Sequence, residues 1–146
     1  MPYPELWTER QNVLAVIHPD LHLGTYYTPW VDMQIYHKLV ALLIVGDITA
    51  TGTVDLELQE ATSAGGAGGK AIVGKAITQL TQAGGDSDDV CAINLRGEEM
   101  DAANDFRYVR ALLDVLVANA NVCLVLLSDY PTSAPVTQVG YTEVIA

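Results

Sequence analysis

Apolar and polar residues alternate most regularly between residues 53 and 60. The alternating residues are Val54, Asp55, Leu56, Glu57, Leu58 and Gln59. A period of two places one set of side chains in a core and the other in water, so this pattern predicts a half-buried strand. Residues 35–45 are apolar throughout their second half, which predicts a strand covered on both sides. The turn sequence of residues 46–52, GDITATG, would join the two strands as a hairpin.

Five other segments have the composition of short strands bounded by turns. They cover residues 13–17, 24–31, 90–95, 106–117 and 122–127. The first is expected to end at a turn over residues 18–20 (HPD). The second suits an edge or irregular strand, because Pro29 cannot donate a backbone hydrogen bond. Further turns are expected at residues 84–89 and 119–121.

Residues 70–83 (KAIVGKAITQLTQA) fit either a helix or strands. Their apolar residues recur at helical spacing: Ile72, Val73, Ala76, Ile77 and Leu80. Gly74 and the Ile, Val and Thr content favour strands instead. We expect strand pieces in this segment.

Many short strands with little helical periodicity predict an all-β fold. We expect an antiparallel β-sandwich, jelly-roll-like, with an extended N-terminal arm. A chain of 146 residues suits one domain. The arm covers residues 1–12, the sandwich residues 13–130, and an extended tail residues 131–146.

The formal net charge of −11, from 18 acids and seven bases, limits the choice of partner. Binding to phosphates or to a membrane surface needs a basic face, so we expect no direct nucleic-acid contact and no membrane. The longest apolar run, residues 39–45, is far below the roughly 20 residues of a membrane span. Glu5, Glu9 and Arg10 precede any apolar segment. We therefore expect no signal peptide, and a protein kept in the cytoplasm or assembled there.

One segment matches the spacing of a phosphate-binding loop. Residues 69–75 read G-x-x-x-x-G-K, but Ala76 occupies the position where a Ser or Thr would hold magnesium. The segment also follows a Gly/Ala-rich stretch where a buried strand is required. We expect a surface loop whose lysines offset nearby acids.

Two other motifs resemble metal sites. His18 and His22 would share one face of a helix, but Pro19 between them disfavours that helix. Residues 86–89 (DSDD) resemble the start of a calcium loop, whose pattern fails at Val90. We expect no metal site and no cofactor.

No catalytic signature stands out in the chain. Glu98 and Glu99 are adjacent, and neighbouring strand residues point to opposite faces, so they do not converge as an acid–base pair. Cys91 and Cys123 lie in apolar runs and suit buried positions. Their spacing alone leaves a disulfide between them open. We expect that the protein is not an enzyme.

The charges are distributed unevenly along the chain. Residues 86–105 carry seven acids and one base, whereas residues 61–85 carry two lysines and no acid. A polarised surface can dock head-to-tail or on a lattice of complementary charge. A large net charge also serves solubility.

The order of segments along residues 31–136 resembles a known family. These segments are an apolar strand at 38–46, GTVDLELQEAT at 52–62, a Gly/Ala/Ser loop, GKAITQLT at 74–81, an acidic turn, INLRGEEMD at 93–101 and FRYVR at 106–110. An apolar strand and a Pro-containing tail follow. The order resembles small virion structural proteins of tailed bacteriophages and prophages.

This resemblance implies a capsid decoration or cement protein. Such a protein would bind the major capsid protein and stabilise its lattice from the virion exterior, after assembly in the bacterial host cytoplasm. It would be a homo-oligomer, with a trimer favoured. An acidic surface agrees with a location outside the DNA-filled shell.

Five residues are candidates for partner binding. Tyr3, Leu6 and Trp7 give the N-terminal arm apolar groups that would dock either on a neighbouring subunit or on the arm's own domain. Arg107 and Arg110 belong to the FRYVR strand. One of these arginines is expected to pair with the acidic turn at 96–105, and the other to be available to a partner.

Two alternatives remain beside a decoration protein. The first is another part of the virion, a head–tail connector or tail component. The second is a small ligand-binding β-sandwich or enzyme, for which a pocket containing His18, His22 or the turn at 86–89 would be the sign.

Overall fold

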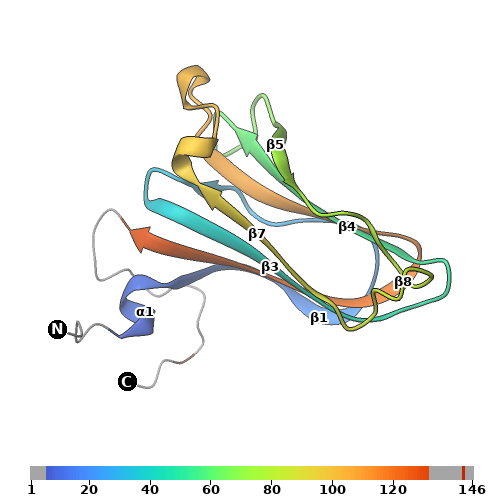
Figure 1. The fold of residues 1–146 in the computed structure, drawn as a ribbon. Coiled ribbons are helices and arrows are strands. Elements are labelled where there is room, and N and C mark those ends of the chain that lie inside the picture. Colours follow the sequence, from blue (N-terminus) through green and yellow to red (C-terminus); the bar gives the residue numbers. More distant parts are fainter. Residues whose placement is uncertain (1–5, 132–142, 144–146) are drawn as a thin grey trace.

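A computed structural model of the chain describes residues 6–131 and 143 (Figure 1). Almost all of its regular structure is β-strand. In chain order the elements are α1 (Trp7–Arg10), β1 (Asn12–Tyr27), β2 (Val31–Asp32), β3 (Tyr36–Ile48), β4 (Thr53–Ala61), β5 (Lys70–Ala76), β6 (Leu80–Thr81), β7 (Val90–Arg96), the 3-10 helices η1 (Gly97–Glu99) and η2 (Ala102–Asn104), and β8 (Tyr108–Pro131).

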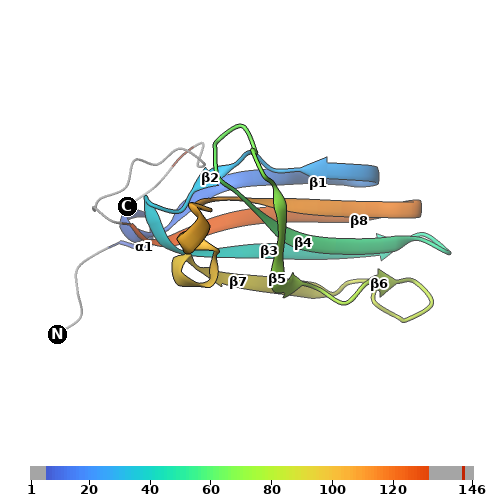
Figure 2. The same ribbon diagram turned by 90° about the horizontal axis from the view of Figure 1, so that it is seen from above.

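The described strands form one antiparallel sheet in which β8 is central. The hydrogen-bonded order is β5-β4-β8-β3-β7, with β1 and β2 on the free side of β8 and β6 beside β4. Figure 2 shows most of these strands side by side, with β1 at one margin and β6 and β7 at the other, while β5 runs across the view. The sheet is folded over once at one end, so it makes two layers (Figure 1).

Long segments cross from one layer to the other. In β8, residues 120–131 pair with β3 in the first layer, and residues 108–116 pair with β4 in the second. β1 follows β8 through both layers, from the pair Asn12–Ser128 to the pair Tyr27–Leu112. β7 belongs to the first layer, and β2, β5 and β6 belong to the second. The all-β, jelly-roll-like sandwich predicted from the sequence is confirmed.

The core lies between the two layers and follows the predicted alternation. In β4, Val54, Leu56 and Leu58 are buried, whereas the polar residues between them are partly exposed. The largest fully buried side chains come mainly from β3, β4 and β8: Leu43, Ile48, Leu56, Leu58, Leu113, Leu124, Leu126, Val54, Val109, Val115 and Val122, with Leu95 from β7. The strand pieces predicted within residues 70–83 are confirmed as β5 and β6.

The hairpin expected between residues 35–45 and 53–60 is wrong. β3 and β4 each pair with β8 and lie in different layers. The turn between them carries the chain around the folded end of the sheet, where Thr49 N donates to Asn119 O at 3.0 Å. The alternation predicted which face of each strand is buried. It could not predict the neighbouring strand, because the same face is buried whichever strand pairs beside it.

Two predicted turns lie inside strands. Residues 18–20 belong to β1, whose register against β8 shifts between Ile17 and Asp20. Pro19 is tolerated there because β1 is an edge strand. At the register shift, no backbone N–H of residue 19 is needed for a hydrogen bond with β8. Residues 119–121 belong to β8, which bends there between the layers instead of forming a hairpin.

The N-terminal segment is partly structured. Residues 1–5 lie outside the described residues, α1 follows, and the side chains of Gln11 and Asn12 are buried. Asn12 already pairs with Ser128, so the first strand begins inside the segment expected to be an arm.

Candidate functional site

The first candidate site is the short helix α1. Leu6 N donates to Glu9 Oε2 at 2.8 Å, which closes the turn, and Arg10 Nε lies 3.0 Å from Asp129 Oδ1 of β8. The helix is therefore tied to the end of the sandwich. Its predicted binding residues face solvent: Leu6 is 44% and Trp7 65% exposed. Tyr3, the third predicted residue of the arm, lies outside the described residues.

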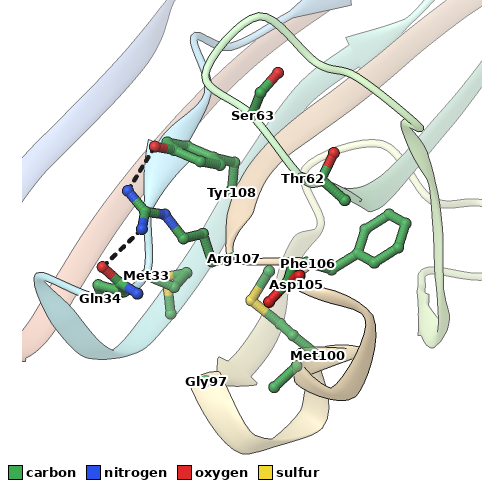
Figure 3. Close-up of a pocket in the computed structure, with 11 residues that line it drawn as sticks. Met33, Gln34, Thr62, Ser63, Gly97, Met100, Asp105, Phe106, Arg107 and Tyr108 are labelled. Carbon is green, nitrogen blue, oxygen red and sulfur yellow. Dashed lines mark hydrogen bonds between the residues drawn. The ribbon is translucent and has the colours of Figure 1, made fainter.

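Arg107 is held by partners within the chain. It donates to Gln34 Oε1 at 2.9 Å and to the Tyr108 hydroxyl at 2.8 Å (Figure 3). It also donates to Asp32 Oδ2 at 3.0 Å. The hydrogen bond with Tyr108 raises the pKa of Arg107, with a further contribution from the Asp32 charge. The guanidinium thus fastens the residues before β3 to the start of β8.

A pocket of about 570 Å³ lies beside Arg107 (Figure 3). Its apolar lining comes from Met33, Met100 and Phe106, and its polar lining includes Arg107 and Tyr108. Asp105 is the carboxylate among its described lining residues, so this lining holds no pair of carboxylates. This pocket lacks His18, His22 and the turn at 86–89. A second hollow, of about 690 Å³, is lined by Asp88 of that turn together with Asp20 and Asn121, so the ligand-binding alternative stays open.

Arg110 lies in a stack of aromatic rings on the outer side of the second layer. Its guanidinium carbon is 4.0 Å from the ring centroid of Tyr27 and 4.5 Å from that of Trp30, and Nε donates to Gln59 Oε1 at 2.9 Å. The loop before β5 closes on Trp30, because a Cβ atom on Gly66 would lie 2.7 Å from Trp30 Nε1.

These contacts correct the expectation for the two arginines. Arg107 pairs with Asp32 and Arg110 stacks on aromatic rings, so the prediction that one of them pairs with the acidic turn at 96–105 is wrong. The partners lie far away in sequence, on segments that only the folded sheet brings together. Binding of a second protein by either arginine stays a prediction.

Arg110→Ala is expected to lower the free energy of unfolding by about 1–2 kcal/mol. The substitution removes the cation from both rings and leaves Gln59 Oε1 without this donor. Arg110→Lys should recover only part of the loss, because a lysine cannot stack as a planar group. Denaturant titrations of the three proteins measure the differences. Equal stability of all three would contradict this role for Arg110.

The lysines of the predicted surface loop pair with two acids of the turn at 96–105. Lys70 Nζ lies 2.6 Å from Asp101 Oδ2 and 4.0 Å from the ring centroid of Phe106. Lys75 Nζ bonds Glu99 Oε1 at 2.9 Å. The hydrogen bond from Lys70 lowers the pKa of Asp101, and that from Lys75 lowers the pKa of Glu99. Residues 70–76 form strand β5, which lacks the loop-to-helix geometry of a phosphate site.

The remaining candidates for chemistry are dispersed. Within the described residues, no group of three His, Cys, Asp or Glu side chains could hold a metal ion. His22 Nε2 lies 2.9 Å from the backbone oxygen of His18. Cys91 is opposite Leu43 and Cys123 opposite Ile44, so the two free thiols lie on opposite faces of the first layer. Burial raises the pKa of both thiols.

The second candidate site is the outer side of the first layer, which we call the outer apolar face. It consists of Val16 on β1, Val40, Leu42 and Ile44 on β3, Val90 and Ala92 on β7, and Cys123, Val125 and Leu127 on β8. The run at 39–45 was expected to be covered on both sides, but Ile44 is 44% exposed. In the sequence, the apolar run at 39–45 indicates this face. That the face is accessible to solvent is seen only in the folded structure.

Comparisons with known proteins add little to these sites. No family model matches the chain, and no curated protein matches it. Among solved structures, the chain is similar to one in "Cryo-EM Atomic Structure of Broad Bean Stain Virus (BBSV)", with 8% sequence identity, a TM-score of 0.48 and 98% of each chain covered. A similarity at this level carries no argument about function. No helix among the described residues is long and apolar enough to cross a membrane.

Proposed function

We propose that the chain is a structural protein of a bacteriophage virion, namely a capsid decoration protein that binds the outside of the major capsid protein lattice. The order of sequence segments shared with small virion proteins supports this assignment. Those segments build β3, β4, β5, β6, β7 and the start of β8, the strands that make most of the sandwich. The proposed role is structural, without catalysis.

The observation that carries the proposal is the exposure of Leu6 and Trp7 on an anchored helix. A tryptophan 65% exposed on a segment fixed by the Arg10–Asp129 ion pair is presented outwards at a defined position. Large aromatic side chains of this kind dominate the binding energy of protein interfaces when they enter a partner's pocket. Docking on a neighbouring subunit is therefore favoured over docking on the chain's own core.

The charge of the chain supports a place outside the shell. A net charge of −11 disfavours contact with packaged DNA and suits an exterior position in many copies. The protein would be assembled onto capsids in the bacterial cytoplasm. The resemblance to small virion proteins favours a trimer as the form that binds.

Trp7→Ala is expected to weaken binding to the capsids of the encoding phage by at least about tenfold, which corresponds to about 1.4 kcal/mol. The reason is that truncation removes the largest exposed apolar group of the helix. Cosedimentation of the purified protein with capsids over a concentration series measures the change. Val73→Ala removes another exposed apolar side chain, on β5, and should bind as the wild type does.

A point substitution tests the helix more cleanly than deletion of residues 1–12. The deletion also removes Gln11 and Asn12, whose side chains are buried, and with them the first pair between β1 and β8. Loss of binding after the deletion would therefore mix instability with loss of contact. Unchanged binding by Trp7→Ala would reject the clamping role of the helix.

A further inference from the structure

The end of the sandwich where the sheet folds over, which we call the folded end, lies opposite the end that carries α1 (Figure 1). It is formed by residues 20–24 of β1, residues 116–121 of β8, the turn between β3 and β4, and the loop before β7. Four exposed apolar side chains gather there on two paired strands: Leu21 and Leu23 of β1, and Leu116 and Val117 of β8. Exposed apolar side chains grouped on neighbouring strands are typical of an interaction site.

Val117 has a backbone conformation that valine does not favour. Its φ is 69°, in the left-handed region, where a branched Cβ crowds the backbone. The side chain is 74% exposed, so it adds little to the core in return. Glycine or asparagine would hold the same bend with less strain. A contact outside the chain, in which this apolar side chain is buried, would account for the valine.

The folded end is acidic as well as apolar. Asp88 N donates to Gly46 O at 2.9 Å, and Ile48 N donates to Ser87 Oγ at 3.2 Å, so the loop before β7 lies against the end of β3. These segments and β1 bring together five aspartates, none of which is ion-paired with a described base: Asp20, Asp47, Asp86, Asp88 and Asp89. The carboxylates therefore lie beside the four apolar side chains and leave this end with an uncompensated negative charge.

The seven bases of the chain lie away from the folded end and have partners within the chain. Arg110 stacks on two aromatic rings, and Lys38 lies opposite Asp129 in the sheet. The other five form ion pairs with acids of the same chain: Arg10, Lys70, Lys75, Arg96 and Arg107. A second copy of the chain therefore offers no uncompensated basic surface to the folded end. Residues 132–146 contain no Lys or Arg, so the tail is not complementary to it either.

We propose that the folded end docks into an apolar depression with a rim of Lys and Arg side chains on the major capsid protein. The inference rests on the proposed function and adds a second contact to the one made by α1. The four apolar side chains would be buried in the depression, and Asp47 and Asp88 would pair with its basic rim. Residues 120–131 of β8 alone span about 40 Å between the two ends, at about 3.3 Å each. The chain would thus hold the lattice at two separate points.

Val117→Asn separates binding from folding. Asparagine tolerates the left-handed backbone, so the variant should melt at the temperature of the wild type or above it. Its binding to capsids of the encoding phage should nevertheless weaken at least about fivefold, because an apolar contact is lost. Val73→Asn is the matched control: it changes a still more exposed valine, on β5, and should bind as the wild type does. Thermal unfolding and cosedimentation with capsids over a concentration series give the two readouts.

The double variant Asp47→Asn/Asp88→Asn tests the basic rim. Asp88 has a φ of 66°, which asparagine also adopts, so the exchange removes two charges and leaves the backbone as it is. The dissociation constant should rise about fivefold at low salt, and the difference from the wild type should shrink as salt screens the attraction. Asp105→Asn is the matched control, because Asp105 is also exposed and left-handed, at φ 61°, but lies at the other end of the sandwich. This control should bind as the wild type does.

The outcomes separate this inference from the proposed function. A wild type that binds capsids, with both folded-end variants binding equally well, would overturn the second contact and leave the contact of α1 in place. A loss with Val117→Asn alone would overturn the basic rim, and a loss with the double aspartate variant alone would overturn the apolar depression. A wild type that does not bind capsids at all would overturn both the inference and the proposed function.

Discussion

Leu124→Ala is expected to lower the free energy of unfolding by about 3–4 kcal/mol, one of the largest losses for any single substitution in this chain. Leu124 is fully buried in β8, between Leu43 of β3 and Ile17 of β1. Its truncation removes buried apolar surface and leaves a cavity in the core. The neighbouring strands β1 and β3 cannot close this cavity, because each is hydrogen-bonded to β8. Urea titration with a two-state fit measures the change.

The neighbouring residue provides the control for Leu124. Val125 points to the outer side of the same strand and is half-buried, so Val125→Ala should cost about 1 kcal/mol. The contrast between adjacent positions depends on the alternation of faces along β8. Equal losses for the two variants would contradict the assignment of the core to one side of this strand.

Gly52→Ala is expected to lower the free energy of unfolding by about 2–3 kcal/mol. A Cβ atom at this position would lie 2.8 Å from Thr49 O and 3.1 Å from Ala118 O. Both are backbone atoms at the end where the sheet folds over, so neither can move away as the tip of a flexible side chain would. The substitution must displace one of the two segments that cross between the layers.

Gly65→Ala separates this steric effect from the general effect of replacing glycine. A Cβ atom on Gly65 would meet only Ser63 Oγ, at 3.7 Å, which is an ordinary contact. This variant should be as stable as the wild type or slightly more stable, because alanine restricts the unfolded chain. Thermal unfolding compares the two variants. A Gly52→Ala protein as stable as Gly65→Ala would contradict the close crossing at the folded end.

Local sequence patterns predicted most strands but not their partners. The alternation in 53–60 identified β4 and its buried face because that information lies in consecutive residues. The pairing of β3 and β4 with β8 depends on residues at least 47 positions away, so a turn sequence between β3 and β4 favoured the wrong hairpin. β8 bends at 117–121, and for this reason its sequence predicted two strands joined by a turn.

The candidate sites were predictable to different degrees. Leu6 and Trp7 stood out because aromatic and apolar groups in a Pro-containing terminal segment have no strand to belong to. The partners of Arg107 and Arg110 could not be predicted in this way. Asp32, Tyr27 and Trp30 are far from them in sequence and come close only in the folded sheet. The outer apolar face was visible as an apolar run, but such a run is typical of a strand covered on both sides, so its exposure could not be predicted from the sequence.

The number of copies bound per capsid tests the decoration role most directly. Purified capsids of the encoding phage, saturated with the chain and separated from the free protein, would be weighed by quantitative gel or mass measurement. A decoration protein binds at a fixed ratio to the major capsid protein over the whole lattice, so saturation is expected at hundreds of copies, in simple proportion to capsid subunits. No binding, or saturation at about a dozen copies confined to one vertex, would contradict it, and the second result would assign the chain to the head–tail connection.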